Sequence, residues 1–181
     1  MFTLSIDSDI KLALVQESFA EIYAELVLKQ TEYLSQWLAW PPHCQSEQDF
    51  RSFIKSALND YAEGTGMTCA ILYNDDIVGN CSFNSICQET KTVQLGYWLS
   101  QDQQNKGIVT RVVQKLIDIA FYQHGMEKVE LHAAEDNWPS RKVAERVGMN
   151  LEGIITNSEK VGDRILAHAI YAIHRSHSPR E

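Results

Sequence analysis

Apolar residues recur at helical spacing through the first part of the chain, after one short alternating segment. Residues 9–15 alternate well enough to predict a strand. The apolar side chains of residues 18–30 fall on one side of a helix. Residues 31–43 predict a second, short helix that stops at Pro41 and Pro42, because proline disfavours helical backbone in the residue before it.

A third helix is predicted by its ends as well as by its pattern. Residues 46–64 begin with Ser46 and have Asp49 three positions later, which is the spacing of a capping box. Gly64 follows the last turn and is a typical helix stop. This helix therefore has sequence signals at both ends.

The pattern then changes from a helical period to a period of two. Residues 67–86 predict a hairpin with its turn at 74–76, and residues 92–100 predict the next strand. A strong helix is predicted at 108–125. The remaining predicted elements are a strand at 128–134, a helix at 138–148, and strands at 149–158 and 163–173.

Antiparallel hairpins followed by a strand–helix–strand crossover predict a mixed α/β (α+β) fold. We expect a mixed, mostly antiparallel central sheet flanked by helices. No repeat, low-complexity stretch or Pro/Gly-rich linker divides the sequence. The prediction is therefore one domain over residues 1–181.

Composition removes several functional classes. The formal net charge is −8, whereas a nonspecific nucleic-acid binder needs a basic surface. No apolar stretch approaches the length of a membrane span, and the first residues have no signal-peptide pattern, so the expectation is a cytoplasmic protein without a membrane partner. The 4 cysteines form no Cys-x-x-Cys pair, so no metal site is predicted.

The polar run 101–111 leads from a predicted strand into the helix that follows. The first turn of a helix has unpaired backbone N–H groups and a partial positive charge, and both favour phosphate. Gly107 permits close backbone approach, and Lys106 and Arg111 add positive charge. The run predicts a diphosphate site, although its spacing is neither that of the P-loop nor that of the dinucleotide fingerprint.

A second motif, residues 137–153, changes the interpretation of this loop. With it, the chain from about residue 10 to 174 resembles the GNAT family of acetyl-CoA-dependent N-acetyltransferases. Gln104 and Gly107 match the family's loop pattern, while Val109 and Asn105 depart from it. The family's later pattern is present as Asn137, Ser140, Val143, Ala144 and Gly148, with Met149 in place of its final aromatic residue.

The resemblance implies the cofactor and where it binds. Acetyl-CoA would lie where the strand at 92–100 splays from the strand at 128–134, although ordinary sheet pairing is the alternative. Asn137 would contact the cofactor arm, cap its own helix, or do both. The implied cofactor-binding residues are Tyr97, Trp98, Leu99, Gln104, Asn105, Lys106, Gly107, Ile108, Val109, Thr110, Asn137 and Ser140.

The resemblance also implies catalytic and substrate-binding residues. Ser140 would protonate the departing thiolate, and Glu159 would act as the general base, although Glu159 alone reads as a solvated charge. The predicted substrate-binding residues are Tyr33, Trp37 and Trp40, for which core packing is the alternative. His132 and His168 receive no role.

The chain most resembles the subgroup that acetylates ribosomal-protein N-termini, especially those that start with serine. The expected acceptor is therefore a protein N-terminus, attacked directly within a ternary complex. A polyamine or aminoglycoside acceptor remains an alternative, as does a noncatalytic acetyl-CoA-binding module. The resemblance further implies a homodimer.

Overall fold

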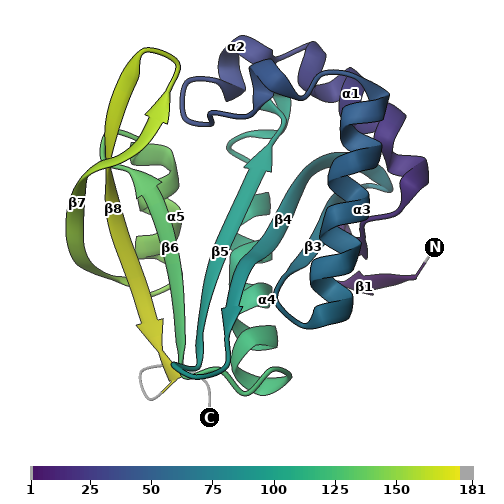
Figure 1. The fold of residues 1–181 in the computed structure, drawn as a ribbon. Helices are drawn as coiled ribbons and strands as arrows, with labels where there is room; N and C mark the ends of the chain where they lie inside the picture. The colour runs from purple at the N-terminus through teal and green to yellow at the C-terminus, as the bar shows by residue number, and fades with distance from the viewer. Residues whose placement is uncertain (1, 176–181) are drawn as a thin grey trace. The chain divides into compact units, whose positions relative to one another are not determined.

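The computed structural model describes residues 2–175, which divide into two compact units. The first unit comprises Met1–Ser82 and Tyr97–Ile108, and the second comprises Phe83–Gly96 and Val109–Glu181. The strands form an 8-stranded sheet in the order β1-β2-β3-β4-β5-β6-β8-β7 (Figure 1). The mixed, mostly antiparallel sheet with flanking helices confirms the predicted fold class.

In the first unit, α1 and α3 pack against each other beside β3 (Figure 1). Tyr23 of α1 and Phe50 of α3 are buried and pack with ring centroids 5.6 Å apart. The elements are β1 (Thr3–Ser5), β2 (Ile10–Leu14), α1 (Ala20–Leu28), α2 (Thr31–Leu34), α3 (Glu47–Glu63) and β3 (Met67–Tyr73), with short 3-10 helices at Glu17–Phe19 and Pro41–His43.

Two strands pass from one unit to the other, and the second unit continues from them. They are β4 (Asp76–Cys87) and β5 (Thr92–Leu99). The later elements are the 3-10 helix Gln101–Gln103, α4 (Ile108–Tyr122), β6 (Lys128–Ala134), α5 (Trp138–Arg146), β7 (Asn150–Val161) and β8 (Arg164–His174). Within residues 2–175, no helix is both long and apolar enough to cross a membrane.

The ladder between β5 and β6 is parallel and ends before either strand does. It runs from Thr92 opposite Lys128 to Leu95 opposite Leu131. β5 then continues to Leu99, whereas β6 keeps its antiparallel pairing with β8 as far as Ala134 opposite His168. β6 therefore continues along β8 after its ladder with β5 has ended.

Several predicted local features have direct counterparts. The hairpin turn lies at Asn74 and Asp75, whose φ angles are 51° and 70°. Asn and Asp tolerate this left-handed region better than most other residues, which explains the turn. Ser46 and Asp49 form the predicted capping box.

The second predicted helix is much shorter than its pattern indicated. α2 ends at Leu34, and the two prolines start a separate 3-10 helix instead of stopping α2. Proline fits the first position of a helix because its missing N–H would have had no partner there. β1 was not predicted, because its three residues are exposed and show no apolar alternation.

Candidate functional site

The loop before α4 has the backbone conformation expected of an anion-binding turn. Asn105 and Gly107 both have positive φ, at 62° and 70°. A Cβ at Gly107 would meet no atom within 4 Å, so backbone conformation and not space favours glycine there. The loop leads into a helix of 15 residues, whose first N–H groups are donors for a phosphate.

The N-cap residue of α2, Gln30, and Tyr33 of α2 hold this loop at two points. Gln30 uses both halves of its amide: Nε2 donates to Ser100 Oγ at 3.1 Å, and Oε1 accepts from the Gln101 N–H at 2.9 Å. Further along, Gln104 Nε2 donates to the Tyr33 hydroxyl. Partial burial raises the pKa of Tyr33 although this hydrogen bond lowers it, so the phenol stays neutral.

In the structure, the side chains of Gln104 and Lys106, which were predicted to bind the cofactor, contact other residues of the protein. The Gln104 side chain is held by Tyr33, and Lys106 Nζ donates to Gln103 Oε1 at 2.7 Å. Lys106 also lies over the Tyr73 ring, 5.4 Å from its centroid. These side-chain contacts thus fix the shape of the loop, and binding of a phosphate by its backbone N–H groups stays a prediction. Gln30 was missed because a lone glutamine at the end of a helix carries no motif.

The end of β5 lies against aromatic rings. Trp98 packs on Tyr23 and Trp40, with ring centroids 5.8 Å and 6.1 Å away. A Cβ at Gly79 would lie 2.3 Å from the Trp98 carbonyl oxygen, so only glycine permits this approach of β4 to β5. These contacts fix the backbone of Tyr97–Leu99, where the cofactor arm was predicted.

The three predicted substrate-binding residues have different surroundings. Trp40 contacts Phe50 as well as Trp98 and packs against the core of the first unit. Tyr33 also packs there, with its hydroxyl at the loop. Trp37 is half-buried on the segment after α2. A substrate-binding role stays a prediction for all three.

In the second unit, α5 begins with the predicted cap. Asn137 Oδ1 accepts from the backbone N–H of Ser140 at 3.3 Å. This places Ser140 in the first turn of the helix, half-buried. The local role of Asn137 is therefore the N-cap, and any cofactor contact would be additional.

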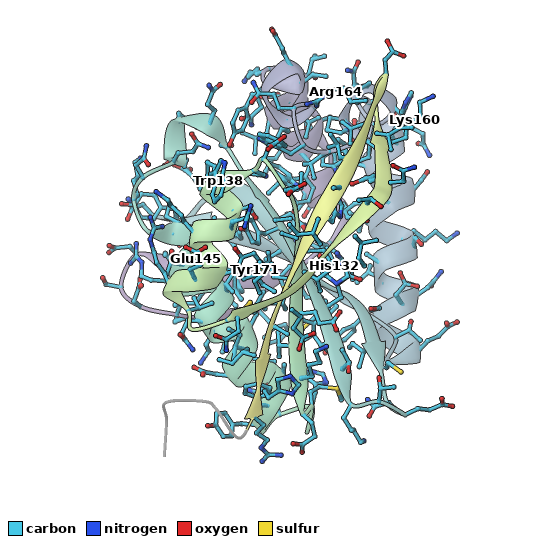
Figure 2. All side chains as sticks on the ribbon, turned by 90° about the vertical axis from the view of Figure 1, so that its left-hand side faces the viewer. His132, Trp138, Glu145, Lys160, Arg164 and Tyr171 are labelled. Carbon is cyan, nitrogen blue, oxygen red and sulfur yellow. The ribbon has the colours of Figure 1, made fainter. Side chains whose placement is uncertain are left out.

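α5 is fixed to β8 through a buried arginine. Arg141 Nε donates to the Tyr171 hydroxyl at 3.1 Å, and its Nη1 donates to the Glu135 carbonyl at 2.8 Å. The Tyr171 hydroxyl in turn donates to Glu145 at 3.1 Å. Figure 2 shows Trp138, Glu145 and Tyr171 on the α5 side of β8. The contacts of Arg141 and Tyr171 orient the helix that carries Ser140.

The opposite face of this part of the sheet is polar. Residues paired across antiparallel strands point to the same face, and alternate residues share a face. Lys128, Glu130 and His132 therefore share one face of β6, and His168, opposite Ala134, lies on the same face of β8. Tyr171 points the other way, towards α5, which agrees with the separate positions of Tyr171 and His132 in Figure 2.

Ion pairs connect this polar face. Lys128 Nζ lies 2.7 Å from Glu130 and 2.6 Å from Glu152 of β7. Glu152 also contacts His174 at 3.2 Å. Burial opposes the charge of Lys128, but its contacts with the two carboxylates outweigh burial and raise its pKa.

Glu159 reaches this face through an irregularity in β7. Ile155 pairs with His168, and Glu159 pairs with Leu166, so β7 advances by four residues while β8 advances by two. The extra residues lie at 156–158, where Asn157 has φ 51°. Leu166 lies two residues from His168 on β8, so its partner Glu159 shares the face of His168, and the side chains of Glu159 and His168 are 3.3 Å apart.

The cysteines do not offer a reactive thiolate near an evident base. Burial raises the pKa of Cys69 to about 12, and burial likewise raises the pKa of Cys81. Cys87 is exposed, and hydrogen bonds with Thr90 lower its pKa. Among residues 2–175, no cluster of three or more His, Cys, Asp or Glu side chains could hold a metal ion.

Comparisons with known proteins agree on one family. The acetyltransferase (GNAT) domain family matches residues 12–150. The ribosomal-protein-serine acetyltransferase of Escherichia coli (strain K12) is 30% identical over 161 residues, which is 89% of this chain and 90% of that protein.

Two solved structures are similar over nearly the whole chain. One is RimL, a ribosomal L7/L12 α-N-protein acetyltransferase in complex with coenzyme A, with TM-score 0.92 and 25% identity over 96% of this chain and 98% of that chain. The other is MccE, a microcin C7 self-immunity acetyltransferase in complex with acetyl-CoA and AMP, with TM-score 0.89 and 29% identity over 93% and 94% of the two chains.

Proposed function

Because the chain belongs to the GNAT family of acetyltransferases, we propose that it acetylates the N-terminal α-amine of a protein that starts with serine. The observation that carries this acceptor is the similarity to a ribosomal-protein-serine acetyltransferase over 89% of this chain. A ribosomal protein is the proposed partner for the same reason.

The proposed acetyl-CoA site uses backbone groups more than side chains. The N–H groups of the loop 104–108 and of the first turn of α4, including Val109 and Thr110, would bind the diphosphate. Backbone groups of Tyr97–Leu99, beyond the end of the β5–β6 ladder, would bind the pantetheine arm. The Nδ2 group of Asn137 would donate to the same arm.

The proposed chemistry is direct attack of a neutral amine on the thioester that acetyl-CoA supplies. An α-amine has an ordinary pKa of ~7.7–8.0, so part of it is neutral near pH 7, unlike a lysine with a pKa of ~10.4. Glu159, directly or through water, would take the amine proton as the C–N bond forms. Backbone N–H groups at Tyr97–Leu99 would stabilise charge on the acetyl oxygen.

Ser140 would give its proton to the coenzyme A sulfur as the C–S bond breaks. The support for this role of Ser140 is its position. Ser140 lies in the first turn of α5, which hydrogen bonds of Asn137 and Arg141 hold in place. A hydroxyl at a helix N-terminus lies in a positive field that stabilises the thiolate leaving group. No covalent enzyme intermediate is needed.

An acetyl-transfer screen tests the acceptor. Purified protein and acetyl-CoA would be offered a serine-initiated peptide, the same peptide with a blocked N-terminus, spermidine and kanamycin, with coenzyme A release as the signal. We expect acetylation of the free serine peptide alone. Acetylation of spermidine or kanamycin instead would favour a cationic small-molecule acceptor, which the net charge of −8 would attract.

Assembly into a homodimer stays a prediction. Its support is a set of exposed apolar side chains on the last two strands: Leu151, Ile154, Ile155 and Ile165. Such side chains are typical of surfaces that pair with another molecule. Light scattering at micromolar concentration that returned the mass of one chain would contradict it.

A further inference from the structure

His168 lies beside the proposed base, Glu159. Its Nε2 lies 3.3 Å from Glu159 Oε2, and the His168 side chain is 15% exposed against 38% for Glu159. Glu159 is the first residue of β7 that pairs again with β8 after the irregularity at 156–158. The imidazole projects from regular β8, paired with β6 on its other side. The rigid partner is therefore the histidine.

A second histidine–carboxylate pair lies beside the first on the same face. His132 Nε2 is 2.9 Å from Glu130 Oε2. His132 pairs with Ile170, so His168 is its diagonal neighbour across β6 and β8. The titratable groups next to His168 are thus Glu159 from β7 and His132 from β6, whereas Glu130 and Lys128 lie further along the same face of β6.

The surroundings of His168 favour its neutral form. Partial burial lowers its pKa below the ordinary imidazole value, the Glu159 charge acts in the opposite direction, and His132 reinforces the lowering. A neutral imidazole next to a carboxylate oxygen presents its N–H, so Nε2 donates to Glu159.

We propose that His168 is a positioning residue for acetyl transfer, which in its neutral form holds the Glu159 carboxylate towards the acceptor amine. This role rests on the proposed function, in which Glu159 takes the amine proton. His168 itself gains and loses no proton during the step. When acid protonates His168, a positive charge stands 3.3 Å from Glu159, which makes the carboxylate a weaker proton acceptor and the site inactive.

The test is the pH dependence of kcat/KM for a serine-initiated peptide between pH 5 and 8. Protonation of the α-amine alone gives a slope of about one below its pKa of ~7.7–8.0. Protonation of His168 adds a second proton, so the wild-type slope should approach about two below the ordinary imidazole pKa of ~6.5. A residue with a purely structural role would not steepen this slope.

Two substitutions at His168 distinguish the loss of its N–H donor from the loss of its ability to take up a proton. His168→Gln keeps an N–H donor of similar reach and cannot be protonated, so its rate at pH 7.5 should stay near that of the wild type and its slope should remain one. His168→Ala removes the donor, and kcat should fall by about 10- to 100-fold, the range for one hydrogen bond to a charged group. Acetyl-CoA affinity, measured by calorimetry, should be unchanged in both and also reports folding.

His132→Gln is the matched control, since it removes an imidazole from the same face without touching the Glu159 pair. It should keep the slope of two. The steep region should begin at slightly higher pH, because His132 lowers the pKa of His168 and the variant lacks this imidazole.

A slope of two in His168→Gln, or a loss in His168→Gln as large as in His168→Ala, would overturn this proposal. Glu159→Gln distinguishes it from the proposed function. Wild-type turnover in Glu159→Gln would remove the base and with it the role of His168. Lost turnover in Glu159→Gln, with His168→Gln still showing the wild-type slope, would remove the role of His168 alone. If the peptide is not acetylated, the same comparison is made with spermidine.

Discussion

The candidate residues of the two units are held in place by different physics. In the first unit, neutral amides and a phenol fix the loop, and aromatic rings fix the end of β5. In the second unit, the candidate residues stand among charges, with Lys128, Glu130, Glu152 and Glu159 on one face of the sheet.

The neutral contacts of the first unit favour cofactor binding, and the titratable groups of the second unit favour proton transfer. A loop that binds a diphosphate through backbone N–H groups needs a fixed shape more than added charge. Proton transfer needs titratable side chains whose environment sets when they are charged. Variants of the loop contacts in the first unit should therefore change acetyl-CoA affinity, and variants of Glu159 and Ser140 in the second unit should change turnover.

The largest effect is expected at Glu159. Glu159→Gln keeps the shape of the side chain and removes the base, so kcat on a serine-initiated peptide should fall towards the upper part of the ~10²–10⁴-fold range for general-base catalysis. Calorimetry should show unchanged acetyl-CoA affinity. A loss of acetyl-CoA affinity in Glu159→Gln would contradict the assignment of cofactor binding and proton transfer to different units.

Ser140→Ala should come next, with kcat lower by about 10²-fold, the lower end of the range for general-acid catalysis. The cap at Asn137 uses the Ser140 backbone N–H, so the helix should keep its start. Stopped-flow measurement of coenzyme A release would check this. Lys142→Ala, an exposed change on the same helix, is the control and should leave the rate unchanged.

Gly107→Ala should weaken acetyl-CoA binding by about 5- to 30-fold, from the ~1–2 kcal/mol that a left-handed backbone costs an L-residue. Gly64→Ala is the matched control: its φ is 72°, and a Cβ there would also meet no atom within 4 Å. It should lower stability and leave affinity intact. Equal affinity losses in both variants would point to a general folding defect instead.

Gln30→Ala should weaken acetyl-CoA binding by about 2- to 12-fold, equivalent to the ~0.5–1.5 kcal/mol of one net hydrogen bond. The loop loses its hydrogen bonds at Ser100 and Gln101, but the Gln101 N–H is exposed and can bond to water instead, so the loss corresponds to one net hydrogen bond. Once acetyl-CoA is saturating, kcat should return to the wild-type value. A reduced kcat at saturation would show that Gln30 also affects the chemistry.

Ser46→Ala should have the smallest effect on function, because the capping box lies at the start of α3. Losing the cap costs about 0.5–2 kcal/mol, which lowers Tm by ~2–4 °C per kcal/mol in a chain of this size. The hydrogen bonds from Ser46 lower the pKa of Asp49, so the box stabilises the fold above the ordinary carboxyl pKa and loses this contribution as pH falls. The Tm difference between wild type and variant should therefore shrink in acid.

Much of the fold followed from the sequence where local signals agreed with the pattern. α3 has a cap, an apolar face and a terminal glycine, and each was found where predicted. α2 shows the opposite case, since its aromatic residues satisfied a helical period that the backbone does not adopt beyond Leu34.

The candidate site was less predictable, because its side chains meet through pairing register. The role of His168 depends on its position opposite Ala134 and Ile155, and no motif encodes this. The only sequence signal is that His168 is a polar residue two positions from Leu166 and two positions from Ile170, so that all three share one face of the predicted strand. The loop prediction, by contrast, used local signals, and the positive φ of Gly107 agrees with the backbone freedom that it assumed. Its role in cofactor binding stays a prediction.

The irregularity at residues 156–158 also bears on how the chain can vary in length. β7 already contains an odd excess of this kind, because it advances by two residues from Leu151 to Gly153 while β8 advances by one from Tyr171 to Ile170. Pairing with Leu166, and not the number of residues in the irregularity, therefore sets the face of Glu159. Insertions and deletions at 156–158 are compatible with the proposed reaction as long as the pair between Glu159 and Leu166 persists.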